Sequence, residues 1–296
     1  MVPGELQAVF RSASRAACNE RALVLTAVNI ASDVRFDGVE FLLCCSVADA
    51  PWAVAHLAQY DNENRPAVSG GVHVEARWHP HAWIGVVVYA IVLIGVALAI
   101  ANGWWRPEAF DNGTLTAATI RDGQWWRAWT ALTLHVDADH LVANLGGGIW
   151  FGYLAARQLG GGMAWFFIVT GAAIANLIEA TVAPATHRAV GASTAVFTAL
   201  GLMAAHSWRI RLPMRLSAAR RWAPLIAGIA LLGWLGTAGE NTDVVAHALG
   251  FGVGCLLGAT AGRHRVQRLL ERVPQWIPAA GALASLALAW SLALAK

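Results

Sequence analysis

The chain has 296 residues, of which 57% are hydrophobic and 13% are charged, and its formal net charge is +3. Soluble domains carry about 25% charged residues, so this composition excludes an ordinary soluble protein and indicates a polytopic membrane protein. The small net charge is not gathered into a basic stripe, which gives no sign of a nucleic-acid partner.

The first 64 residues are predicted to form a small soluble α-β-β-α module. Its expected elements are a helix at 15–30, strands at Ser32–Phe36 and Val39–Cys45, and a helix at 49–64. Asp37-Gly38 between the two strands is a strong hairpin signal. Residues 65–80 follow, and their glycines and prolines are typical of a linker.

Seven later segments have about the 20 apolar residues that a helix needs to cross a bilayer. They are residues 82–103, 139–156, 163–183, 192–208, 222–238, 242–261 and 275–295. Arginines gather in the loops after the second, fourth and sixth segments, and basic short loops face the cytoplasm. The N-terminal module is then also cytoplasmic, and the connection at 104–138 faces outward.

We therefore expect an all-α membrane fold preceded by the α+β module. Residues 81–262 are predicted to form a core of six spans, and residues 263–296 a basic loop followed by a seventh transmembrane helix. The abundance of alanine, glycine, tryptophan and arginine, with little lysine, suggests a bacterial inner-membrane protein.

Four polar residues stand near the outer ends of three spans that run in the same direction. They are His140 and Asn144 in the second span, Ser193 in the fourth and His247 in the sixth. At a rise of about 1.5 Å per residue, all four lie in the outer third of the bilayer. An ionisable group inside a span is costly and is a functional-site hypothesis by default.

These residue types suit acyl transfer. A serine hydroxyl becomes a nucleophile when a base takes its proton, which assigns Ser193 as the nucleophile and His247 as the base. His140, Asn144 and the backbone amide of Ser193 can donate to an oxyanion. Each residue alone also has an ordinary reading, because a membrane serine often only packs and a membrane asparagine often joins helices.

Other residues are predicted to support this pair. Gly191 lets a substrate backbone approach the serine, and Phe197 lies one turn after the serine, where it can pack against the imidazole. Gly250 and Gly254 have the four-residue spacing that lets helices pack closely. Asp243 precedes the histidine by one turn and could be a third triad member. We instead expect Asn241, Thr242 or Asp243 to cap the sixth span.

Several motifs occur together between Gln124 and Gly258. They are Trp126-Arg127, His135, His140-Leu141-Val142-Ala143-Asn144, Asn176, Gly191-Ala192-Ser193 and Ala246-His247-Ala248-Leu249-Gly250 with Gly254. Together they resemble the rhomboid family of intramembrane serine proteases. The resemblance implies a dyad of Ser193 and His247, an oxyanion hole of His140, Asn144 and the Ser193 amide, and no cofactor. The family usually has glycine after the serine, where this chain has Thr194.

The expected function is therefore intramembrane proteolysis of transmembrane proteins near their outer ends, with membrane lipid as the surroundings. A metal site is not expected, because His135 and His140 are five residues apart and no HExxH run exists. A catalytically silent rhomboid-like protein that binds transmembrane helices is the first alternative. A small-solute transporter is the second, and it would predict inverted repeats, which are not seen.

Overall fold

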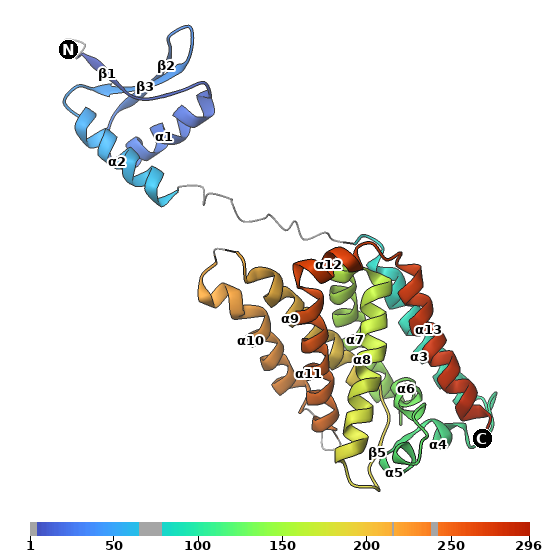
Figure 1. Cartoon of the computed structure of the whole chain (residues 1–296). Helices are drawn as coiled ribbons and strands as arrows, with labels where there is room; N and C mark the ends of the chain where they lie inside the picture. The colour runs from blue at the N-terminus through green and yellow to red at the C-terminus, as the bar shows by residue number, and fades with distance from the viewer. Residues whose placement is uncertain (1–4, 65–78, 215, 238–241) are drawn as a thin grey trace. The chain divides into compact units, whose positions relative to one another are not determined.

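The computed structural model describes residues 5–64, 79–214, 216–237 and 242–296. It divides into two compact units, residues 1–72 and 73–296, which are described in turn (Figure 1).

The N-terminal unit is a three-stranded antiparallel sheet packed against two helices. Its elements are β1 (Leu6–Ser12), α1 (Arg15–Ala27), β2 (Ser32–Phe36), β3 (Phe41–Ser46) and α2 (Ala50–Glu63), and the strand order is β1-β3-β2. The core between sheet and helices is made by Leu25 of α1, Leu43 and Cys45 of β3, and Ala53 and Leu57 of α2. These side chains are buried, and burial of apolar surface is what holds so small a unit together.

The expectation of an α-β-β-α module is wrong in one respect, because it omits β1. The register of β1 against β3 shifts between Ala8 and Phe10. Such a bulge breaks the period-two alternation by which a strand is recognised.

The hairpin predicted at Asp37-Gly38 is confirmed, since β2 and β3 pair antiparallel on either side of it. The turn is longer than two residues: Asp37 Oδ1 accepts the backbone N–H groups of Val39 and Glu40, each at 2.9 Å, and β3 begins only at Phe41. Of the predicted linker, residues 65–78 lie outside the described part of the chain.

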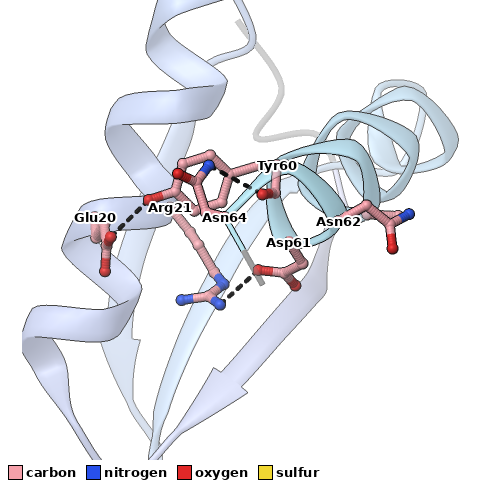
Figure 2. A pocket seen from close by; sticks show the side chains of 7 residues that line it. Glu20, Arg21, Tyr60, Asp61, Asn62 and Asn64 are labelled. Atoms are coloured by element: carbon pink, nitrogen blue, oxygen red, sulfur yellow. Dashed lines mark hydrogen bonds and ion pairs between the residues drawn. The ribbon is translucent and has the colours of Figure 1, made fainter. Parts of the chain in front are cut away.

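A polar pocket lies between α1 and α2 (Figure 2). Arg21 forms an ion pair with Asp61 at 2.7 Å, and the Tyr60 hydroxyl donates to Glu20 at 2.6 Å. The Arg21 guanidinium also lies 4.1 Å from the centre of the Phe10 ring. The polar groups of this pocket thus bond one another and join the two helices.

The second unit is a helical bundle. Its long helices are α3 (Ala82–Ala101), α7 (Ala138–Leu159), α8 (Gly161–Val182), α9 (Ser193–Arg211), α10 (Ala218–Leu235), α11 (Val244–Ala261) and α13 (Trp276–Leu294). Each overlaps one of the predicted spans, and the largest difference is at the start of α10, which begins at Ala218 where residue 222 was predicted. Four of them, α3, α8, α11 and α13, are long and apolar enough to cross a membrane.

The connection between α3 and α7 is folded rather than extended. It contains α4 (Ala109–Gly113), β4 (Leu115–Thr116), α5 (Ala117–Arg121), α6 (Arg127–Thr130) and the 3-10 helix η1 (Ala131–Thr133). Strand β4 pairs antiparallel with β5 (Arg188–Ala189), which lies in the loop between α8 and α9. This pairing ties the connection to the segment that leads into α9. A last short helix, α12 (His264–Leu270), follows α11.

Helix α9 lies at the centre of the bundle, and most of its residues are buried. Helix α11 packs directly against it through glycines. A methyl group at Gly250 would lie 2.6 Å from the Thr194 carbonyl oxygen, and one at Gly254 would overlap the Thr198 carbonyl oxygen. The residue numbers of the contacting pairs increase together along both helices. Helices α9 and α11 therefore run parallel, and their N-terminal ends lie at the same end of the bundle.

This close contact makes Gly254→Ala destabilising. The added methyl group meets backbone, which cannot move aside, so we expect a loss of about 1–3 kcal/mol in the free energy of unfolding. Gly252→Ala, in the same helix, is the matched control, because nothing lies within 4 Å of its added methyl group. Thermal unfolding in detergent measures both, and equal Tm values for the two variants would contradict the packing described here.

Candidate active site

The imidazole of His247 lies on the ring of Phe197. The two ring centroids are 4.4 Å apart and the planes are tilted by 34°. Phe197 is one turn after Ser193, the first residue of α9, so the two side chains share a helix face. A long side chain in a helix covers the turn that precedes it. The imidazole therefore lies beside the first turn of α9, which holds Ser193.

The hydrogen bond at the other ring nitrogen selects the tautomer of His247. Its Nδ1 lies 2.9 Å from the carbonyl oxygen of Gly236. A carbonyl oxygen only accepts, so Nδ1 carries the hydrogen and the neutral ring presents an unprotonated Nε2. That nitrogen is the one that can take a proton from a nucleophile.

Asp243 caps α11. Its Oδ1 accepts the Ala246 N–H at 2.9 Å, so Asp243 is the N-cap among the three candidates, of which Asn241 lies outside the described residues. The hydrogen-bond partner of His247 Nδ1 is the Gly236 carbonyl. A backbone carbonyl thus occupies the position that the side chain of a third triad member would take.

His140 and Asn144 lie against the backbone that leads into Ser193. A methyl group built on Gly191 would lie 2.7 Å from the His140 ring and 3.6 Å from Asn144 Nδ2. Gly191 has φ +134°, a conformation that favours glycine, and its N–H donates to the Ala131 carbonyl at 2.9 Å. The N-terminal parts of α7 and α9 thus meet at this glycine, two residues before the serine.

The side-chain amide of Asn144 is a candidate hydrogen-bond donor to a ligand. Asn144 is buried, and its Nδ2 has no hydrogen-bond partner among the described residues. Buried polar groups are almost always paired, and leaving one unpaired costs about 1–3 kcal/mol. A donor kept open at this cost, beside Gly191, is available to a ligand.

Tyr89 of α3 positions Asn144, and sequence reasoning did not find it. Its hydroxyl donates to the backbone carbonyl oxygen of Asn144 at 2.7 Å. The available signal is that Tyr89 is the only hydroxyl group in an otherwise apolar span.

Thr194, the residue after Ser193, is buried between α9 and α11. Its methyl carbon would lie 3.2 Å from a Cβ at Gly250, and it is 4% exposed. The side chain therefore fills the helix interface.

From this placement we expect Thr194→Gly to weaken packing more than chemistry. Glycine is a weaker helix former than threonine by roughly a few tenths of a kcal/mol, and the lost methyl contact adds to this. The Tm should fall while the reactivity of Ser193 is retained, as measured by labelling with a fluorophosphonate. A rise in labelling of tenfold or more would instead mean that Thr194 crowds the serine.

Trp126 and Arg127 order the connection between α3 and α7. Arg127 is buried, and its Nη1 donates to the carbonyl oxygens of Asp111 and Thr114 at 2.5 and 2.7 Å. Trp126 packs in an apolar cluster with residues of α13, including Trp290. These contacts give both residues a supporting role, not a place among the reacting groups.

His135 joins the same connection to the start of α9. Its Nε2 accepts the Ala192 N–H at 3.4 Å, and its ring centroid is 5.1 Å from that of His140. Burial lowers the pKa of His135 to about 4, so the ring is neutral at physiological pH, as an acceptor must be. Asn176 Nδ2 makes a similar tie, donating to the Ala128 carbonyl at 2.9 Å.

The apolar helices and the folded connection define a multi-pass helical membrane protein. Residues 122–264 match the family model of the Rhomboid domain, and this range contains the four polar residues described above. This part of the chain is therefore a rhomboid domain. A comparison with curated proteins finds no match.

Proposed function

We propose that this rhomboid protein is an intramembrane serine endopeptidase in which Ser193 is the nucleophile and His247 the general base. The proposal rests on the contacts of the His247 imidazole. Its ring is packed on Phe197 and its Nδ1 is tied to the Gly236 carbonyl. The basic Nε2 is thereby left for the hydroxyl at the start of α9.

In the proposed reaction, Ser193 Oγ attacks the scissile carbonyl carbon while His247 Nε2 takes the hydroxyl proton. The tetrahedral intermediate collapses, the C–N bond breaks, and the imidazolium gives its proton to the leaving amine. Water then attacks the acyl carbon with the same histidine as base, the ester bond to Ser193 Oγ breaks, and the imidazolium returns its proton to that oxygen. The Gly236 carbonyl stabilises the imidazolium, because it accepts the Nδ1 hydrogen throughout.

The developing oxyanion needs donors. Asn144 Nδ2, the His140 ring and the Ser193 N–H are the proposed ones. Ser193 is the first residue of α9, where backbone N–H groups lack an intrahelical partner and the helix dipole favours negative charge. The unpaired Asn144 donor supports this assignment.

We further propose that all seven long helices cross the membrane, with the site near the outer face and the N-terminal unit in the cytoplasm. Helices of 18 to 22 residues span about 27–33 Å, close to the hydrocarbon thickness of about 30 Å. Ser193 and His247 lie in the first turns of α9 and α11, whereas Arg209 and Arg211 end α9. Basic residues favour the cytoplasmic side, which puts the serine outside. Transmembrane substrates then enter from the lipid.

Cleavage of a transmembrane reporter, co-reconstituted in liposomes with the full chain, tests the proposal. We expect the wild-type protein to release a fragment cut near the outer end of the reporter, and Ser193→Ala to release none. Cleavage that continues unchanged in Ser193→Ala would show that the proposal is wrong.

A further inference from the structure

Three potential metal ligands from distant parts of the chain converge where α8 ends and α11 begins. They are Glu179 in the last turn of α8, His187 in the loop after it, and Asp243 at the N-cap of α11. One ligand atom from each lies within 4.8 Å of the others. The Ser193–His247 mechanism makes no use of this cluster.

The distances in the cluster fit coordination. His187 Nε2 lies 3.4 Å from Glu179 Oε1 and 3.2 Å from Asp243 Oδ2. Two ligands of a tetrahedral zinc ion, each bonded at 2.0–2.2 Å, are separated by about 3.4 Å. Neither His187 Nε2 nor the Glu179 oxygens have a hydrogen-bond partner among the described residues, so these atoms approach one another without hydrogen-bond geometry.

The burial of the Glu179 carboxylate indicates that a cation binds here. Its side chain is 1% exposed and neither carboxylate oxygen has a hydrogen-bond partner among the described residues, and burying a carboxylate is costly unless a cation and hydrogen bonds offset it. It also lies at the negative end of the α8 dipole, which disfavours a carboxylate. Arg121, at this helix end, donates to the carbonyl oxygens of Ala180, Thr181 and Ala183, so its charge is directed to the backbone.

We propose that Glu179, His187 and Asp243 form a binding site for a divalent metal ion of the zinc class. One histidine and two carboxylates are ligands that zinc accepts, and the magnesium class prefers oxygen alone. The side chains of His187 and Asp243 are 24% and 27% exposed, which leaves a path for the ion and room for a water as fourth ligand. The expectation of a metal-free protein is revised by this proposal.

The bound ion would clamp α8 to α11 beside the proposed base. Asp243 holds the first turn of α11 through two backbone contacts, since its Oδ1 accepts the Ala246 N–H and its carbonyl accepts the His247 N–H at 3.1 Å. The carboxylate oxygen that faces His187 is the other one, Oδ2. Asp243 can therefore cap the helix and bind the ion together.

Zinc titration of the untagged, full-length protein in detergent, after removal of metal by a chelator, tests the site. We expect one zinc ion per chain and a Tm that rises with zinc. His187→Ala, Glu179→Gln and Asp243→Asn should each weaken zinc binding at least tenfold. Asparagine caps helices as well as aspartate, so Asp243→Asn removes the ligand and keeps the cap.

His264→Ala is the control for adventitious binding, because His264 is an exposed histidine outside the cluster, and this variant should bind zinc like the wild type. Zinc binding that is absent from the folded wild-type protein, or unchanged in all three cluster variants, would overturn the proposal. Neither readout depends on proteolysis, so a failure here is distinct from a failure of the proposed dyad.

Discussion

Ser193→Ala and His247→Ala should each lower the rate of reporter cleavage by at least about 10³-fold, and the double variant should be no slower than either one. A nucleophile and its base act as one unit, so removing the second member costs nothing further once the first is gone. The measurement is single-turnover cleavage in liposomes with all three variants.

Two variants control for indirect effects. Ser207→Ala changes a serine in the same helix whose hydroxyl bonds Gln158, and His264→Ala changes an exposed histidine; both should cleave at the wild-type rate. Rate losses that multiply in the double variant would mean that Ser193 and His247 act independently, which contradicts a dyad.

Gly191→Ala should lower the cleavage rate by about 10²-fold or more. The new methyl group would lie 2.7 Å from the His140 ring, and it would also strain a backbone held at φ +134°. The ring and the segment before Ser193 must then move apart, and a misplacement of about 1 Å near reacting groups costs on this order. The measurement is the same single-turnover assay.

Gly123→Ala separates the clash from the strain. Gly123 has φ +92°, but nothing lies within 4 Å of a methyl group added there. This variant carries strain without a clash, so we expect it to be less stable yet active. If both glycine variants lost activity equally, contact between Gly191 and His140 would not be what the site requires.

The apolar runs were sufficient to predict every long helix of the second unit, because a run of about 20 apolar residues has few alternatives to a helix in a membrane. Strand β1 could not be predicted in the same way. Its bulge between Ala8 and Phe10 interrupts the alternation that marks a strand.

The residues proposed for the reaction were predictable because each is a polar group in an apolar segment. The groups that orient these residues could not be predicted from the sequence. The Gly236 carbonyl that orients His247 is backbone and has no sequence signal. Glu179, His187 and Asp243 are separated by 8 and 56 positions in the chain, spacings that match no metal motif, and only the packing of α8 against α11 brings them together.

If His247 activates Ser193 as a nucleophile, Ser193 should react with a fluorophosphonate, and the mass of the protein after this reaction measures it directly. We expect one adduct per chain, mapped by peptide sequencing to Ser193 and absent from His247→Ala. A folded wild-type protein that forms no adduct, under conditions where a soluble serine hydrolase is fully modified, would contradict activation of Ser193 by His247.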